Sequence, residues 1–189
     1  MRELFATGAM LCFLVSITLV GCRFGDAYPY ESDSGVSAIV YQLQSQYGIG
    51  GKYSVIQMSY DDSVGLVINA TGVVEGSTDL VVRRMKRGKW SQLSSASLKT
   101  MVEQPFLFTL DSISDLKKIP DLINSSCYKL SAEIRKPGLH AKEVMIHAPG
   151  FGLEGDLIRI SIHIHPQDAL GKFEYSYNTA GVLQDVQQY

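Results

Sequence analysis

The sequence predicts an α+β fold of two tandem units, each one helix followed by a four-strand antiparallel meander. Short alternating runs rich in Val, Ile, Tyr and Phe dominate the chain and indicate strands. Two segments instead carry apolar residues at helical spacing. The second segment repeats the first at a constant offset, so that Ile119, Leu122, Ile123 and Leu130 correspond to Val36, Ile39, Val40 and Tyr47. This repeat is the main reason for expecting two similar units.

The first unit is expected to span residues 36–100. Its helix places Val36, Ile39, Val40, Leu43 and Tyr47 on one face. Ser34 or Asp33 can cap the start of this helix, and Gly48 can end it. Four strands are predicted to follow, at Lys52–Tyr60, Val64–Thr71, Asp79–Met85 and Trp90–Ser94, with a hairpin turn at residues 86–89.

The second unit is expected to span residues 101–189. Pro120 suits the first turn of its helix, where the missing N–H costs nothing. Strands are predicted at Ala141–Ala148, Asp156–His165, Lys172–Tyr177 and Val182–Gln188. One helix covers one face of a four-stranded sheet, so the other faces either pack together or stay open. Three aromatic side chains that share a face favour a core facing the helix over an open aromatic patch: Phe173, Tyr175 and Tyr177.

The composition is that of an ordinary globular protein. Of the 189 residues, 46% are apolar and 19% are charged. The net charge of −2 gives no indication of a nucleic-acid partner. After the N-terminal segment, no window offers the roughly 18 uninterrupted apolar residues of a transmembrane helix.

The N-terminus has the layout of a secretory signal over residues 1–21. Arg2 precedes an apolar run from Phe5 to Val20, which is interrupted by Gly8. The motif that ends the run, Leu19-Val20-Gly21-Cys22, resembles the bacterial lipobox. The resemblance implies cleavage after Gly21, a diacylglyceryl group on the Cys22 sulfur and acylation of the new amino terminus, for example by palmitate. An ordinary signal peptide and a spanning anchor are the alternatives.

A lipidated Cys22 would make the mature chain a domain tethered to a membrane. Two or three acyl chains hold a protein nearly permanently, whereas one chain binds only marginally. Residues 22–35 would then form the lipidated cysteine and its tether. Arg23 follows Cys22 where many inner-membrane lipoproteins of enterobacteria have Asp. By that resemblance we expect the periplasmic face of the outer membrane in a Gram-negative source.

The three cysteines agree with this interpretation. Cys12 lies in the removed peptide and Cys22 carries the lipid, which leaves Cys127 alone. No intramolecular disulfide is then expected, although the compartment would permit one. Cys127 falls on the apolar side of its predicted helix, which favours a buried, inert thiol.

The mature part, over residues 36–188, resembles PepSY-like and beta-lactamase-inhibitor-protein-like folds, in which helix-plus-sheet units recur in tandem. "ISDLKKIPDLI" and "YSYNTAGVLQDV" also look like segments of uncharacterised proteobacterial lipoproteins. The resemblance implies an envelope location and protein binding, and it supplies no catalytic residues. A cystatin-like arrangement, one helix wrapped by a meander, is the alternative.

Five basic residues surround the predicted hairpin turn of the first unit: Arg83, Arg84, Lys86, Arg87 and Lys89. The simpler interpretation is a soluble turn whose charges discourage edge pairing. The sharper interpretation is a contact for anionic lipid headgroups, lipopolysaccharide phosphates or an acidic partner.

The four histidines all fall in the second unit. His163 and His165 share the polar face of one strand, and His147 is expected on the same face of a neighbouring strand. Three imidazoles on adjacent strands could hold Zn²⁺ or Cu²⁺. A solvated polar face explains them more simply, and no metal or other cofactor is expected.

No motif places a nucleophile in a usable context. We therefore expect no enzyme but a membrane-anchored envelope lipoprotein that acts as a protein-binding or assembly module, with an envelope protein as its partner. The alternatives are a periplasmic inhibitor, a small-ligand or metal-binding protein, and an enzyme with an unrecognised site.

Overall fold

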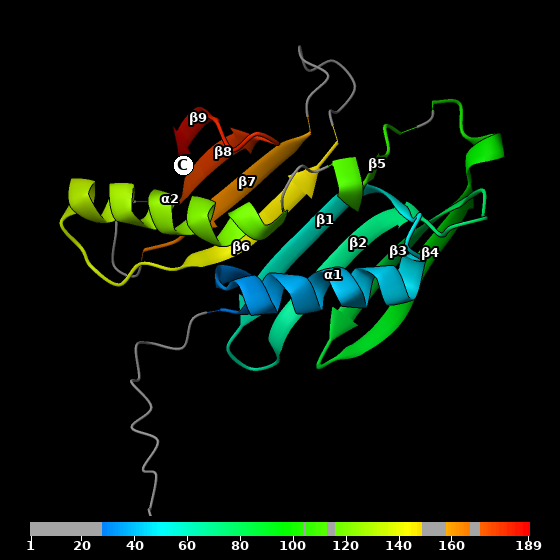
Figure 1. Ribbon diagram of the computed structural model, residues 1–189, viewed down its shortest axis with the longest axis horizontal. Coiled ribbons are helices and arrows are strands. Elements are labelled where there is room, and N and C mark those ends of the chain that lie inside the picture. The colour runs from blue at the N-terminus through cyan, green and yellow to red at the C-terminus, as the bar shows by residue number, and fades with distance from the viewer. Residues whose placement is uncertain (1–27, 104, 113–115, 149–157, 167–170) are drawn as a thin grey trace, which may run out of the picture.

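Nine strands form one antiparallel sheet in the computed structural model, which describes residues 28–103, 105–112, 116–148, 158–166 and 171–189. Two α-helices lie on the same face of this sheet (Figure 1). We call this face the covered face and the opposite one the open face. No helix among the described residues packs on the open face.

The strands follow the helices in chain order. After α1 (Asp33–Tyr47) come β1 (Lys52–Asp61), β2 (Gly65–Val73), β3 (Asp79–Lys86) and β4 (Lys89–Ser97). After the two-residue β5 (Phe108–Thr109) and α2 (Ile119–Ile134) come β6 (Ala141–His147), β7 (Arg159–Ile164), β8 (Phe173–Asn178) and β9 (Leu183–Gln188). Their order across the sheet is β4-β3-β2-β1-β6-β7-β8-β9, and β5 pairs with the start of β1.

The prediction of two tandem helix-plus-four-strand units is wrong. β1 and β6 pair directly, with Ile56 opposite Ile146, so every strand belongs to one sheet and the fold is predominantly β. One continuous core of buried side chains also runs beneath both helices. The physical reason is that strand edges pair through backbone groups, which the side-chain pattern does not specify.

α1 forms because its apolar residues share one face, which is buried at Val36, Ile39, Leu43 and Tyr47. Its cap is Ser32 rather than the predicted Ser34 or Asp33. The Ser32 hydroxyl accepts a hydrogen bond from the Gly35 N–H at 3.2 Å. Gly48 ends the helix, as predicted, with a φ of 83°.

α2 begins with Ile119 and Pro120 and ends before Arg135, which adopts the left-handed conformation at φ 54°. Four 3-10 turns complete the described helices: η1 (Pro29–Glu31), η2 (Leu98–Thr100), η3 (Leu110–Ser112) and η4 (Leu116–Lys118). None of the helices in the described part of the chain is both long and apolar enough to cross a membrane.

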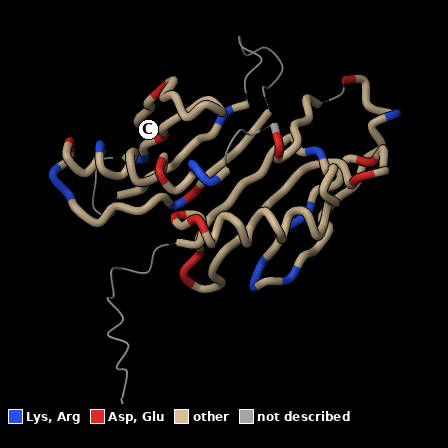
Figure 2. Tube along the Cα trace, viewed as in Figure 1, with Lys and Arg blue, Asp and Glu red and all other residues tan. Residues whose placement is uncertain are grey.

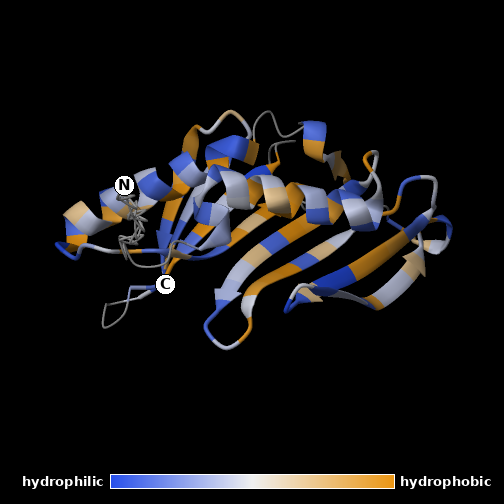
Figure 3. Ribbon diagram, turned by 60° about the horizontal axis from the view of Figure 1, so that its bottom comes forward, coloured by the Kyte–Doolittle hydropathy of each residue, from blue (hydrophilic) through white to orange (hydrophobic). Residues whose placement is uncertain are grey.

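The covered face holds the core. Hydrophobic and hydrophilic residues alternate along the strands (Figure 3), and the hydrophobic set points toward α1 and α2. The expectation that Phe173, Tyr175 and Tyr177 form core is confirmed, because all three are buried against this face. The open face carries their polar neighbours.

Candidate functional site

The β3–β4 turn separates the five predicted basic residues into three environments. Lys86 and Lys89 flank the turn residues Arg87 and Gly88, which have φ of 53° and 69°. Two positive φ angles in a row are typical of the tight hairpin turns that match strand twist. The side chains of Lys86, Arg87 and Lys89 are exposed, and we call these three residues the basic tip.

Arg83 and Arg84 do not belong to the basic tip. Arg83 lies on the covered face, where its guanidinium donates to the Gln46 carbonyl and sits 5.2 Å from the centroid of the Tyr47 ring. Arg84 lies on the open face and donates from Nε to Asn69 Oδ1 at 2.6 Å. Alternation along the strand sends Arg83 to the opposite face from Arg84 and Lys86, and the anionic contact expected for the five residues stays a prediction.

Trp90 fixes the basic tip to the helix layer. Its indole Nε1 donates to Gln42 Oε1 of α1 at 3.2 Å, and its ring is half-buried against the core. This bond joins the start of β4 to α1, so the tip has a defined position relative to the covered face.

The described chain enters the fold at Tyr28, beside the end of β1. The Tyr28 ring stacks on Tyr60 with centroids 4.5 Å apart, and its hydroxyl accepts a bond from Lys142 Nζ at 2.8 Å. Tyr60 lies at the same end of the strands as the basic tip, because Ser59 pairs with Val67 and Val67 pairs with Lys86. The chain entry and the basic tip thus share one edge of the molecule (Figure 1).

A buried carboxylate secures this entry. Glu31 is 7% exposed and accepts hydrogen bonds from three donors: the Tyr28 N–H at 2.9 Å, His140 Nδ1 at 3.0 Å and the Ala141 N–H at 3.2 Å. Nearby, the Tyr30 hydroxyl donates to the Ala141 carbonyl at 2.9 Å. Sequence reasoning missed this cluster, because Glu31 and His140 lie 109 positions apart and no local pattern connects them.

β4 forms an outer edge of the sheet and is exposed along most of its nine residues. Among the described strands it pairs with β3 alone. Its residues from Trp90 to Ser97 are uncharged, and Leu93 is 51% exposed. Natural edge strands are usually shortened, charged or bulged. β4 is long and uncharged from Trp90 onward, and its one irregularity is the register shift that leaves Leu93 without a partner on β3.

The opposite edge, β9, is guarded. It has six residues, and Asp185 stands in its middle. The Asp185 carboxylate accepts the outward Val186 N–H at 2.9 Å and the Gln187 side-chain amide at 2.7 Å. A strand that tried to add to this edge would meet a negative charge and an occupied donor.

The three candidate metal ligands lie apart. His147 and His163 share the open face, but His147 pairs with Arg159, four residues before His163, which places them about 13 Å apart along the strand. His165 follows β7 and lines a hollow of about 150 Å³ with Tyr28, His140 and Lys142. Burial lowers the pKa of His147 and of His165. The described residues contain no group of three His, Cys, Asp or Glu side chains that could hold a metal.

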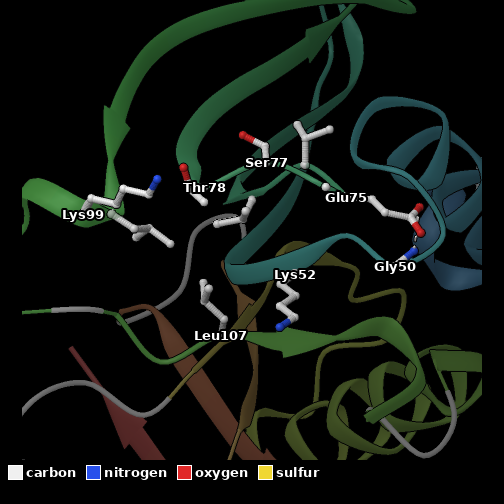
Figure 4. Close-up of a pocket in the computed structure, with 11 residues that line it drawn as sticks. Gly50, Lys52, Glu75, Ser77, Thr78, Lys99 and Leu107 are labelled. Atoms are coloured by element: carbon white, nitrogen blue, oxygen red, sulfur yellow. Dashed lines mark hydrogen bonds between the residues drawn. The ribbon is translucent and has the colours of Figure 1, made fainter.

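A polar hollow of about 360 Å³ lies at the far end of the strands from the basic tip. Figure 4 shows Lys99 on one wall and Lys52 on another, with Ser77, Thr78 and Leu107 between them. Two of its polar side chains already form hydrogen bonds with backbone groups nearby. Glu75 accepts a bond from the Gly50 N–H at 3.2 Å, and the Ser77 hydroxyl accepts one from the Asp79 N–H at 3.0 Å. The lysines remain the groups most suited to an anionic ligand.

Cys127 is a free, half-buried thiol on α2. Burial raises its pKa to about 12, so it is a thiol rather than a thiolate near neutral pH. The lipobox, Cys22 and the tether up to residue 27 lie outside the described residues.

No protein-family model matches this sequence, and no curated protein matches it. One solved structure is similar, described as that of a putative lipoprotein from Clostridium difficile 630. It shares 11% sequence identity, the match covers 81% of this chain and 91% of that one, and the TM-score is 0.44. At that level the likeness identifies neither a family nor a function for this chain.

Proposed function

We propose that this chain is a lipid-anchored, non-enzymatic protein-binding module of the bacterial envelope, held through Cys22 on the periplasmic face of the outer membrane. The lipobox Leu19-Val20-Gly21-Cys22 supports the anchor. The well-secured start of the fold at Tyr28 fits this proposal, since Tyr28 lies six positions after Cys22. At roughly 3.4 Å per residue, the domain would stay within about 20 Å of its anchor.

The open edge of β4 is the observation that supports protein binding. Its unpaired N–H and C=O groups can accept an extended segment of a partner as a further strand, with main-chain hydrogen bonds supplying affinity. Leu93 offers an exposed apolar contact on this edge. The contrast with β9, whose outward Val186 N–H is bound by Asp185, supports β4 as the edge that receives a partner.

A proline in β4 tests the edge. Lys86 and Lys89 pair across a two-residue turn. Residues that flank such a turn form a hydrogen-bonded pair, so alternation directs the Gln92 N–H away from β3. Gln92→Pro should therefore block strand addition while leaving the β3 hydrogen bonds intact. Val186→Pro is the matched control, because the Val186 N–H also points outward, on β9.

The readout is site-specific photocrosslinking in intact cells, with the full-length protein carrying the crosslinker at Ser95 of β4 or at Gln187 of β9. We expect one defined envelope protein to crosslink from Ser95, to be lost in Gln92→Pro and to be retained in Val186→Pro. Equal crosslinking from both edges, or a partner that persists in Gln92→Pro, would contradict binding at β4. Urea unfolding of each variant controls for folding.

Replacement of the lipidated cysteine tests the anchor separately. Cys22→Ser should leave an unprocessed precursor without lipid, detected by mass spectrometry and by metabolic labelling with a fatty-acid analogue. Mature-size protein with unchanged membrane fractionation would refute the lipoprotein assignment.

The polar hollow supports a second candidate function, the binding of a small anionic ligand. Its volume of about 360 Å³ falls within the range of ligand pockets, and Lys52 and Lys99 line it. Calorimetry with inorganic phosphate and with citrate should then give heat that is lost in Lys52→Gln/Lys99→Gln. Equal heat for wild type and variant would remove this candidate.

A further inference from the structure

The position of the basic tip relative to the chain entry has a consequence for how the domain stands at a membrane. The tip and Tyr60 lie at one end of the strands, two strand spacings or about 10 Å apart across the sheet. Tyr28 stacks directly on Tyr60. A tether that begins at Tyr28 and ends in the bilayer six residues earlier therefore holds this edge, and with it the basic tip, close to the lipid surface.

We propose that Lys86, Arg87 and Lys89 dock on anionic lipid headgroups of the membrane that carries the anchor, as a second contact that orients the domain. This inference rests on the proposed lipid anchor at Cys22. The length of the tether and the sign of the charge favour a headgroup surface over an acidic protein as the occupant. An orientation fixed in this way would turn the polar hollow at the far end of the strands away from the bilayer.

The charge balance at this edge determines the strength of the contact. Figure 2 shows the blue β3–β4 turn beside the red β1–β2 turn along the same edge. The red residues are Asp61 and Asp62. Hydrogen bonds from the hydroxyl and the N–H of Ser63 lower the pKa of Asp61, and the charge of Lys86 adds to this effect. Lys142 adds a cation where the chain enters. Because the tip must compete with these carboxylates, docking should be weak by itself, sensitive to salt and dependent on the tether.

The protein contains its own reporter of docking. Trp90 is the single tryptophan of the sequence and stands directly after the basic tip. The lipidated full chain is extracted from membranes and reconstituted into vesicles of phosphatidylcholine alone or of phosphatidylcholine with phosphatidylglycerol. Each vesicle type carries a headgroup-bound nitroxide, which quenches tryptophan fluorescence at short range.

Docking predicts stronger quenching of Trp90 in the vesicles that contain phosphatidylglycerol, and loss of this difference in high salt. Lys86→Gln/Arg87→Gln/Lys89→Gln should abolish the difference while the protein still floats with the vesicles. The matched control, Lys117→Gln/Lys129→Gln/Arg135→Gln, removes two exposed lysines and one exposed arginine away from the tip and should quench like the wild type.

The outcomes separate this inference from the proposed anchor. Equal quenching in both vesicle types, or a tip variant that keeps the difference, overturns headgroup docking and leaves the anchor in place. An acidic envelope protein that binds wild type and not the tip variant, with equal quenching in both vesicle types, assigns the tip to a protein instead. A wild-type chain that fails to float with either vesicle overturns both proposals.

Discussion

The covered face and the open face are built from the same strands, yet their residues differ in burial and therefore in what they contribute to stability. On the covered face, Ile56, Ile146 and Ile160 stand opposite one another and are almost completely buried. On the open face, their neighbours Gln57 and Met145 are half-exposed. Position on the pleat, rather than position in the sequence, should decide the energetic cost of a substitution.

The largest expected effect is at the centre of the covered face. Ile146→Ala should lower the free energy of unfolding by about 2–5 kcal/mol, because it removes a buried side chain and leaves a cavity. Met145→Ala, one residue away on the open face, should cost less than about 1 kcal/mol. Urea unfolding of both variants measures the contrast, and equal losses would contradict the assignment of faces.

A close backbone approach on the covered face should give the next largest effect. A Cβ added at Gly72 would lie 2.3 Å from the Lys52 carbonyl oxygen and against the Tyr53 ring. Gly72→Ala should therefore destabilise by about 1–3 kcal/mol through overpacking. Thr71→Ala, on the open face, is the matched control. Thermal unfolding that shows no difference between the two would mean that β1 and β2 can separate freely at this point.

Breaking a polar pair should also cost more on the covered face than on the open face. On the covered side the Tyr177 hydroxyl and Ser126 Oγ lie 2.7 Å apart in a buried site, and Ser126 also donates to the Leu122 carbonyl. Ser126→Ala should cost about 1–2 kcal/mol, because the Tyr177 hydroxyl is left without its partner. Gln57→Ala breaks the open-face bond to Asn69 and should stay within about 0.5 kcal/mol. A reversed order in chemical denaturation would be inconsistent with the assigned faces.

Removing the hydroxyl group should change the free energy of unfolding in opposite directions at two neighbouring tyrosines. The Tyr47 hydroxyl donates to the Ala70 carbonyl at 2.7 Å, whereas the buried Tyr53 hydroxyl has no hydrogen-bond partner among the described residues. Tyr47→Phe should destabilise by about 1 kcal/mol, and Tyr53→Phe should be neutral or stabilising by up to about 1 kcal/mol. Differential scanning calorimetry compares the two. Destabilisation by Tyr53→Phe would indicate that its hydroxyl has a partner.

The smallest expected effect is the pH dependence of stability that comes from His147 on the open face. Burial lowers the pKa of His147 in the folded protein, so the unfolded chain binds this proton more tightly. The contribution of neutral His147 to the free energy of unfolding is fully present above the usual histidine pKa of about 6.5. It is lost as the pH falls through the lower pKa that His147 has in the folded protein. Urea midpoints measured across this range should fall less steeply for His147→Gln than for the wild type. Identical slopes would remove His147 as a source of acid sensitivity.

The basic stretch and the entry cluster show how far sequence reasoning reaches for the site. Alternation and turn chemistry located the hairpin at residues 86–89 and its exposed Lys86, Arg87 and Lys89. Counting charges along the chain could not show that Arg83 faces α1 while Arg84 faces the opposite side of the sheet, where it bonds to Asn69. The bonds of Glu31 to His140 and Ala141 were beyond prediction, because contacts so distant along the chain leave no periodic signal.

The sequence by itself determined the local elements and the two faces of each strand. Apolar residues at helical spacing, Gly48 and Pro120 set the helices, and alternation set which side of the central strands faces the core. Only the tertiary structure decided that β1 pairs with β6, that one sheet replaces two units, and that β4 remains an open edge. The reason is that strands join through backbone hydrogen bonds available at every edge, and the shared core beneath α1 and α2 selects among them.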